Sequence, residues 1–265
     1  MRLPVESGAR VYLQPGRQGP LRAGRRWVYR TEIERIEGDF EPGDTVQVID
    51  AYGRFVGKGF INLHSMLSVR LLTEDPDEPI DEDFWVRRIV RAWNYRRLVL
   101  GREVTSFRVV FAEADGLPGL IVDKFDDVLV YQTLSLGIDR WKPVILRALD
   151  DLFLPVGIYE RNDAPVRELE GLETVKRCVK GLPEPRVRMR ENGLTFTVDV
   201  LEGQKTGYFL DQRDNRAAVR ELVRGARVLD AFCYTGGFAC HAAAGGAREV
   251  VAVDSSAPAI ELGQE

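Results

Sequence analysis

The sequence predicts three structural units in chain order: a small β-barrel, a central α+β domain, and the beginning of a Rossmann-like α/β sheet. Residues 1–73 hold short alternating apolar runs separated by Gly, Pro and Asp turns, which favours a compact barrel. Residues 80–190 mix strand and helix patterns without regular alternation. From residue 226 the order becomes strand, glycine loop, helix, strand, and both strands are continuously apolar, which is typical of a parallel sheet covered on both faces. We assign this third unit to residues 191–265.

The composition is that of a globular protein. Of its 265 residues, 45% are hydrophobic and 29% are charged, and a chain of this length can bury substantial cores. No apolar run approaches the roughly 18 residues that span a membrane, and the first residues lack the apolar segment of a signal peptide. We therefore expect a cytoplasmic protein with no membrane partner.

The cysteines and histidines predict neither disulfides nor a metal site. Cysteine occurs three times, an odd number without any C-x-x-C pair, and the two histidines are isolated in the sequence. These residues are Cys178, Cys233, Cys240, His64 and His241. A metal site needs converging ligands, so we expect no bound metal and a reducing environment.

The first unit is basic within an acidic protein. The net charge of the chain is −4, but residues 1–30 contain seven arginines and one acidic residue. This segment can form a phosphate-binding patch or a solvated surface in a chain that prefers arginine to lysine, and the charge alone does not separate the two. The candidate RNA-binding residues are Arg22, Arg25, Arg26 and Arg30.

The central unit begins with a helix after an acidic, proline-containing linker. In "DEDFWVRRIVRAWNYRRLVL", Trp85, Ile89 and Trp93 recur every four residues, which predicts a buried stripe opposite a wet, arginine-rich face. Strands with turns at Asp115-Gly116 and Pro118-Gly119, a second helix and a further strand follow. The final element of this pattern is a hairpin, "RVRMRENGLTFTVDV", with a type I′ turn at Asn192-Gly193.

Two acids mark a candidate ligand site in the last unit. Asp230 ends the first parallel strand, Thr235 to Gly237 form the turn, and Asp254 ends the next strand 24 residues later. An acid at the end of the second strand can accept hydrogen bonds from both ribose hydroxyls. The loop lacks G-x-G-x-x-G, and Asp230 would repel a pyrophosphate but attract the amino group or sulfonium of S-adenosylmethionine. We predict S-adenosylmethionine; another nucleotide or a plain turn remain alternatives.

The run "GQKTGYFLDQRDNR" precedes the first strand of this sheet and can fold over its ligand end. Lys205, Thr206, Asp211 and Arg213 could then present donors and acceptors to the cofactor carboxylate, while Tyr208 or Phe209 covers its apolar part. The same residues suit a helix N-terminus near Asp211, and both interpretations can hold together.

These motifs resemble the ribosomal RNA large-subunit methyltransferase I family, S-adenosylmethionine-dependent enzymes that make 5-methylcytosine in 23S rRNA. "GQKTGYFLDQRDNR", "VLDAFCYTGGFACHAA" and "VVAVDSS" carry the resemblance, and "ADGLPGLIVDKF" with "GIYERND" extends it over the central domain. "PGDTVQVIDAYGRFVGKGF" is similar to the family's N-terminal PUA domain, a small RNA-binding β-barrel. The resemblance implies a class I methyltransferase sheet, S-adenosylmethionine as cofactor and 23S rRNA as partner.

The resemblance also assigns roles within the site. Residues 230–237 would be the methionine-side loop, Asp254 the ribose acid, and residues 203–216 a wall of the cofactor site. The predicted cofactor-binding residues are Lys205, Thr206, Phe209, Asp211, Arg213, Asp230, Phe232, Tyr234, Thr235, Gly236, Gly237, Asp254 and Ser255.

The sequence departs from the family at the catalytic residues. Cytosine C5 is a poor nucleophile, so such enzymes first add a cysteine thiolate to C6; the family carries this cysteine and an Asp-Pro-Pro-type loop downstream of the second strand. The chain ends at Glu265, before both, so we expect a truncated catalytic domain with no catalytic residue and no activity. A non-catalytic RNA-binding protein, a base-nitrogen methyltransferase and a nucleotide-dependent oxidoreductase are the alternatives, and the oligomeric state, a homodimer included, stays open.

Overall fold

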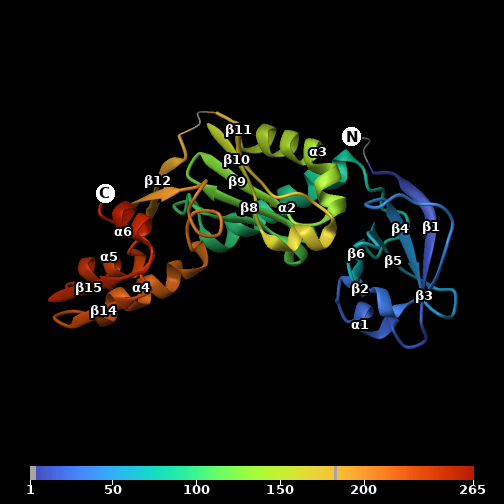
Figure 1. The fold of residues 1–265 in the computed structure, drawn as a ribbon, viewed down its shortest axis with the longest axis horizontal. Coiled ribbons are helices and arrows are strands. Elements are labelled where there is room, and N and C mark those ends of the chain that lie inside the picture. Colours follow the sequence, from blue (N-terminus) through green and yellow to red (C-terminus); the bar gives the residue numbers. More distant parts are fainter. Residues whose placement is uncertain (1–3, 182–183) are drawn as a thin grey trace.

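The computed structural model describes residues 4–181 and 184–265. Three units follow one another along the long axis of the molecule (Figure 1). They are the N-terminal β unit (residues 4–73), the central domain (residues 82–180) and the C-terminal unit (residues 186–265). No helix among the described residues is long and apolar enough to cross a membrane.

The N-terminal β unit is a six-stranded sheet in the order β2-β6-β5-β4-β1-β3. Strands β1 and β4 are parallel and all other pairs are antiparallel. The inward residues, among them Val11, Val48 and Val69, form one hydrophobic core. The elements are β1 (Glu6–Leu13), α1 (Gln18–Arg22), β2 (Trp27–Tyr29), η1 (Arg30–Glu32), β3 (Ile33–Glu37), β4 (Thr45–Ile49), β5 (Phe55–Ile61) and β6 (Leu67–Thr73).

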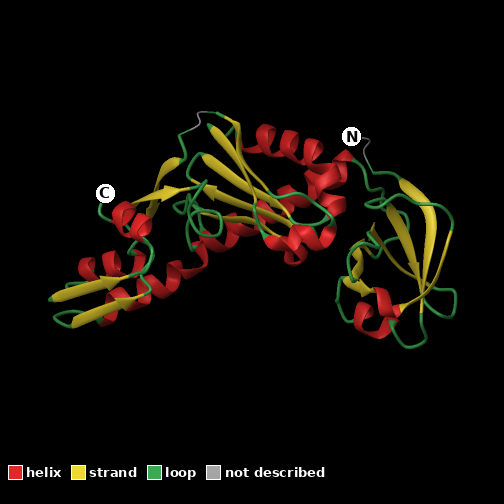
Figure 2. Ribbon diagram, viewed as in Figure 1, coloured by secondary structure: helices red, strands yellow, loops and turns green. Residues whose placement is uncertain are grey.

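The central domain is a five-stranded sheet, β11-β10-β9-β8-β7, packed against two long helices (Figure 2). Helix α3 is the crossover between the parallel strands β9 and β10, and the remaining pairs are antiparallel. The elements are α2 (Glu82–Leu100), β7 (Phe107–Phe111), η2 (Ala112–Asp115), β8 (Leu120–Phe125), β9 (Val128–Thr133), α3 (Leu136–Phe153), β10 (Gly157–Asn162), η3 (Pro165–Glu170) and β11 (Val175–Lys180).

Helix α2 confirms the predicted buried stripe. Asp81 caps its N-terminus by accepting a hydrogen bond from the amide of Phe84 at 2.9 Å. Trp85 and Ile89 are fully buried, and Trp93 packs against the same core. Trp85 also stacks on Phe60 of β5, which joins the central core to the N-terminal β unit.

Buried polar contacts hold these two units together. Arg140 of α3 donates to the Pro42 carbonyl at 2.7 Å and to Asp44 at 3.0 Å. Glu170 of η3 accepts from Asn62 at 3.0 Å and pairs with Arg70 at 2.8 Å. Unpaired buried charges are costly, so these pairs fix how the N-terminal β unit sits on the central domain.

The C-terminal unit starts with the predicted hairpin and continues as a two-stranded parallel sheet. Asn192 and Gly193 have φ values of 50° and 81°, as a type I′ turn requires. Helix α4 begins at Arg213 after a short 3₁₀ turn, close to the predicted start near Asp211. The elements are β12 (Arg186–Glu191), β13 (Leu194–Asp199), η4 (Leu210–Gln212), α4 (Arg213–Leu222), β14 (Arg227–Ala231), α5 (Gly237–Ala244), β15 (Glu249–Val253) and α6 (Ala257–Gly263).

The parallel strands differ from the prediction in their burial. Within the described residues, β14 and β15 expose large apolar side chains, including Leu229, Val251 and Val253. Helix α5 packs against both strands, whereas α6 contacts β13 of the hairpin. In the part of the chain that the structure describes, the sheet is therefore not covered on both faces: α5 packs against one face, and the apolar side chains named above stay exposed.

Candidate functional site

The loop after β14 has an unusual backbone that its neighbours hold in place. Phe232, Tyr234 and Gly236 have φ values of 64°, 53° and 76°, a left-handed region that side chains other than glycine rarely adopt. The Tyr234 amide donates to Asp254 at 2.8 Å, and the Tyr234 hydroxyl donates to the Gly207 carbonyl at 3.0 Å. The loop is thus fixed both by the second strand and by the segment that precedes β14.

The two candidate acids lie at the same edge of the sheet. Strands β14 and β15 are parallel and pair in register, so Asp230 near the end of β14 and Asp254 just after β15 are neighbours. Asp230 accepts a hydrogen bond from the Ala239 amide at 2.9 Å. Asp254 accepts from the Ser256 amide at 2.9 Å through its other oxygen. The fold thus places the two candidate acids at one edge of the sheet.

The environments of the two carboxyl groups shift their pKa values in opposite directions. Burial, reinforced by the negative charge of Asp254, raises the pKa of Asp230 although the Ala239 amide opposes the shift. Hydrogen bonds from the backbone amides of Ser256 and Tyr234 lower the pKa of Asp254. Asp254 therefore stays ionised to a lower pH than Asp230 does.

Residues 203–216 lie between this loop and the central domain. Phe209 packs edge-on against Tyr234, with ring centroids 5.7 Å apart. Lys205 pairs with Asp211 at 3.2 Å, and its ammonium lies 4.3 Å from the Phe209 ring centroid. Hydrogen bonds from Gln212 and Lys205 lower the pKa of Asp211, outweighing the opposing effect of burial. Arg213 pairs with its neighbour Asp214 at 2.9 Å.

Thr206 faces the central domain. Its buried hydroxyl donates to Asp123 of β8 at 2.5 Å. The same carboxylate accepts two hydrogen bonds from Arg108 of β7, at 2.8 and 2.9 Å. Thr206 therefore anchors residues 203–216 to the central sheet, and its predicted contact with a cofactor stays a prediction.

Sequence reasoning missed a second anchor, Arg161 of β10. This buried guanidinium donates to the carbonyls of Val200 at 3.1 Å and Gly203 at 2.8 Å, and it pairs with Asp163 at 3.1 Å. The sequence hint for this anchor is the polar run "ERND", whose first three residues lie in β10, a strand that is buried at every position. The motif was noted for its resemblance, but its contact with residues 200–203 is not visible in the sequence.

A buried charged cluster below the loop was also missed. Arg216 of α4 makes two hydrogen bonds to Glu191 of β12, at 2.6 and 2.8 Å, and both side chains are buried. His241 of α5 is fully buried, lies 3.7 Å from Glu191, and shares a hydrogen bond with the Gly237 carbonyl at 2.8 Å. The cluster ties the hairpin to the helices on which the loop rests.

The donor set at this edge fits S-adenosylmethionine. The Asp254 carboxylate has remaining acceptor capacity for a ribose diol, and Asp230 offers an oxygen that no described residue uses. The Thr235 hydroxyl is buried without a hydrogen-bond partner among the described residues. Phe232, 91% exposed, presents an uncovered aromatic ring beside these groups, and Gly236, Gly237 and the exposed Ser255 complete the two loops. A ligand with hydroxyls, a cationic group and an apolar ring matches these features.

The cysteines near the loop are poorly suited to nucleophilic attack. Burial, together with the negative charges of Asp230 and Asp254, raises the pKa of Cys233. Cys240 is exposed, and partial desolvation together with the negative charge of Asp230 raises the pKa of its thiol. No cluster of three His, Cys, Asp or Glu residues that could hold a metal occurs in residues 4–181 and 184–265.

The candidate RNA-binding arginines are largely paired. Arg22 pairs with Asp50 at 3.1 Å, Arg25 with Glu32 at 2.7 Å, and Arg26 with Glu74 at 2.9 Å. Arg30 is exposed. Phosphate would have to compete with these carboxylates at three of the four positions, so the phosphate-binding role of this group stays a prediction.

Two protein families match parts of the chain. Residues 11–74 match the PUA-like domain family, and residues 173–265 match the S-adenosylmethionine-dependent methyltransferase family. The predicted fold class is confirmed, as is S-adenosylmethionine as the predicted cofactor.

Known proteins resemble the chain over nearly its whole length. It is 42% identical over 255 residues to the ribosomal RNA large subunit methyltransferase I of Alteromonas mediterranea, covering 96% of this chain and 64% of the relative. The protein of the same name from Shewanella denitrificans is 41% identical, with 97% and 65% covered. The resemblance seen in the sequence is thereby confirmed, and the chain spans somewhat less than two thirds of the length of these relatives.

Solved structures share the fold. A structure assigned to a SAM-dependent methyltransferase of Streptococcus mutans superposes with a TM-score of 0.81 at 20% identity, covering 96% of this chain and 65% of that one. A methyltransferase solved in complex with SAH also gives a TM-score of 0.81, at 19% identity. At these identities the likeness concerns the fold.

Proposed function

We propose that the chain is part of an rRNA methyltransferase. Two observations support this proposal: the chain joins a PUA-like domain to an S-adenosylmethionine-dependent methyltransferase sequence, and its relatives are named ribosomal RNA large subunit methyltransferase I. The observation that carries this proposal is the meeting of Asp230 and Asp254 at the ligand edge of a parallel sheet. Residues 1–73 would bind RNA, and residues 191–265 would hold the cofactor. Residues 80–190 would connect these two parts.

In this proposal each residue at the sheet edge has a binding task. Asp254 accepts hydrogen bonds from the ribose hydroxyls, and Asp230 with the loop 232–237 faces the cationic methionine end. Phe209 and Phe232 cover apolar parts, while Lys205 and Arg213 lie where a carboxylate could be bound. The bound cofactor supplies an electrophilic methyl group on a sulfonium. The residues of this chain orient it and shield it from water.

We further propose cytosine C5 in 23S rRNA as the methyl acceptor. Such a reaction needs a thiolate that adds to C6 of the base. The raised pKa values of Cys233 and Cys240 speak against either as this nucleophile, and Cys178 lies on β11, outside the C-terminal unit. The proposal therefore assigns cofactor binding to this chain and no catalytic residue to it.

The test is cofactor binding by the 265-residue chain. Calorimetry with S-adenosylhomocysteine should give a measurable Kd, and Asp254→Ala should weaken binding about tenfold or more, since a hydrogen bond to a charged group contributes about 1.5–3 kcal/mol. Glu221→Ala, an exposed acid of the same unit, is the matched control and should leave the Kd unchanged.

Asp254 also holds the Tyr234 amide, so a folding readout accompanies the binding measurement. Asp254→Asn, which keeps one acceptor oxygen, should retain the native circular dichroism spectrum and still bind more weakly than wild type. Unchanged affinity in both variants would remove Asp254 from the site, and no binding by the wild-type chain would contradict the proposal for this chain.

A further inference from the structure

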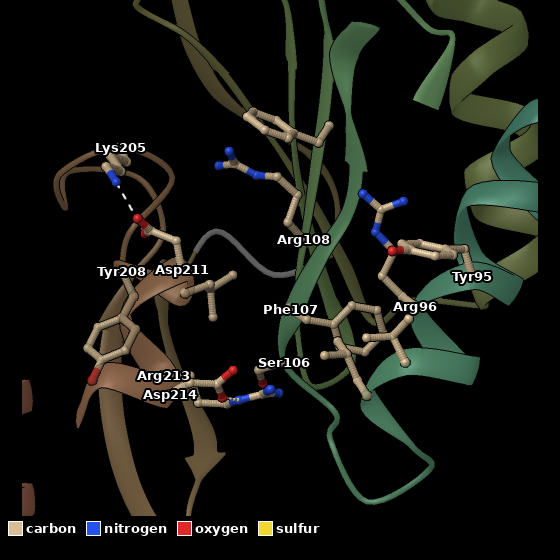
Figure 3. Close-up of a pocket in the computed structure, with 14 residues that line it drawn as sticks. Tyr95, Arg96, Ser106, Phe107, Arg108, Lys205, Tyr208, Asp211, Arg213 and Asp214 are labelled. Atoms are coloured by element: carbon tan, nitrogen blue, oxygen red, sulfur yellow. Dashed lines mark hydrogen bonds and ion pairs between the residues drawn. The ribbon is translucent and has the colours of Figure 1, made fainter. Parts of the chain in front are cut away.

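A pocket separate from the cofactor loop lies between the central domain and residues 205–214 (Figure 3). Its volume is about 600 Å³, enough for a small molecule or a nucleotide. One wall comes from α2 and β7, and the other comes from the segment that Thr206 anchors to Asp123. Phe107 and Arg108 project from the first wall, and Lys205 and Asp211 stand on the other.

Exposed aromatic rings are the first notable feature of the pocket. Tyr95 of α2 is 59% exposed and Phe111 of β7 is 52% exposed, although large aromatic side chains usually contribute to the core of a folded protein. A guanidinium lies against each ring: Arg96 is 5.4 Å from the Tyr95 centroid and Arg108 is 5.2 Å from that of Phe111. Aromatic rings flanked by guanidinium groups are the surfaces on which unpaired bases stack.

The charge of the lining is the second feature. Four cationic side chains face two carboxylates, and these six are Arg96, Arg108, Lys205, Arg213, Asp211 and Asp214. Arg108 stays one-third exposed even while it binds Asp123, whose side chain is buried. An exposed guanidinium of this kind can bind a phosphate without giving up its structural pair. Each of the four cations also has a carboxylate partner: Arg96 pairs with Asp115, Arg108 with Asp123, Lys205 with Asp211 and Arg213 with Asp214. The lining is therefore close to neutral, and a phosphate would bind through the exposed part of the Arg108 guanidinium.

The pocket is distinct from the candidate cofactor site. None of its lining residues comes from the loop 230–237 or from Asp254. The two sites share the segment 205–213 as a common wall, because Lys205, Asp211 and Arg213 are also candidate cofactor ligands. Tyr208 belongs to the same wall, and its hydroxyl points away from the pocket in Figure 3. That hydroxyl lies toward α5, since a Cβ on Gly237 would come within 2.6 Å of it. A ligand in the pocket would therefore lie next to the cofactor and not in its place.

We propose that this pocket binds an unpaired nucleotide of the RNA substrate, with the base against Tyr95 and Phe111 and the phosphate toward Arg108. The inference rests on the proposed function, which supplies RNA as the ligand. It adds a second RNA contact, outside the N-terminal β unit and beside the cofactor. Single-stranded RNA is the form whose bases are free to stack.

The test compares RNA binding by the 265-residue chain and two variants. The probe is a fluorescein-labelled single-stranded RNA 12-mer of mixed sequence, measured by anisotropy at low salt, next to the same sequence as a duplex. Tyr95→Ala combined with Phe111→Ala should weaken single-strand binding about tenfold or more, because stacking on one aromatic residue contributes a factor of about five or more per base. Leu98→Ala is the matched control and should leave RNA binding unchanged: Leu98 is 83% exposed on the same helix, α2, but does not line the pocket.

The outcomes separate the inference from the function on which it rests. Selective loss of single-strand binding in the double variant, with S-adenosylhomocysteine affinity and melting temperature unchanged, supports the pocket, and Tyr95→Trp should retain binding. Equal RNA affinity in wild type and double variant, equal loss for the duplex, or loss of S-adenosylhomocysteine binding would overturn the inference. If the wild-type chain binds RNA through Tyr95 and Phe111 but does not bind S-adenosylhomocysteine, the proposed function fails while the pocket stands.

Discussion

The central sheet and the C-terminal sheet use similar strand sequences but bury them very differently. Strand β9, "VLVYQT", is buried at five of its six positions, whereas β15, "EVVAV", exposes four of its five residues. The difference lies in the layers around the strands. Helices α2 and α3 join the core of the central sheet, whereas among residues 4–181 and 184–265 α5 is the main helix packed against β14 and β15. Apolar sequence makes a strand, but the packing partners decide how much that strand stabilises the fold.

The candidate cofactor site is built on the less covered of the two sheets. Its loop is held mainly by polar contacts from outside that sheet: Tyr234 to Gly207, Thr206 to Asp123, and Arg161 to Gly203. The buried Arg216–Glu191 pair supports the helices below it. The central domain thus acts as the rigid base for a site whose own sheet contributes little burial.

The largest expected effect tests this dependence on polar anchors. Arg216→Met leaves Glu191 buried without its partner, which typically costs about 3–5 kcal/mol. Hydrogen exchange should show the lost protection in β12 and β13, while the amides of β8 and β9 stay protected. Arg227→Met, which removes an exposed ion pair with Glu249, is the control and should cost less than about 1 kcal/mol. Similar small losses in both variants would mean that the buried pair does not hold the unit.

A smaller effect compares the two sheets directly. Val130→Ala in β9 removes fully buried methyl groups and should lower the free energy of unfolding by about 2 kcal/mol. Val251→Ala in β15 changes a side chain that is 45% exposed and should cost less than about 0.5 kcal/mol. Urea denaturation of the two variants and the wild type gives both values. A cost for Val251→Ala equal to that for Val130→Ala would show that β15 is buried in solution.

Local patterns made much of the fold predictable. The Asn192-Gly193 turn, the buried face of α2 and the strand-loop-helix-strand order after residue 226 each depend on residues close together in the sequence. The meeting of Asp230 and Asp254 was also predictable, because carboxyl ends of neighbouring parallel strands share an edge.

The contacts that the sequence did not reveal all join distant segments. Thr206 meets Asp123 and Arg161 meets Gly203 across 83 and 42 residues. The pocket brings Tyr95 and Phe111 against a segment more than 90 residues away. Pairing of Arg22 with Asp50 likewise depends on the packed fold. Periodicity reports which face of an element is apolar, but it does not say which polar groups will meet across elements.

The smallest expected effect distinguishes the two acids at the sheet edge by their response to pH. The pKa of Asp230 is raised in the folded chain, so its ionised form is disfavoured there, and the resulting destabilisation is present above the folded pKa and absent below the unfolded value near pH 4. Asp230→Asn should therefore raise the melting temperature at pH 7 by about 1–2 °C, since the amide oxygen can still accept from Ala239. That gain should disappear below pH 4, where the wild-type carboxyl is neutral as well.

Asp254 should behave in the opposite way. Its pKa is lowered by the amides of Ser256 and Tyr234, so the stability that it contributes is present above the unfolded pKa and lost as the pH falls through the folded one. Asp254→Asn should lower the melting temperature at pH 7, and the loss should shrink in acid. Calorimetric melts of both variants at pH 3.5 and pH 7 give the two signs. Equal signs would mean that the two carboxylates share one environment, and the separate binding tasks proposed for them would lose their physical basis.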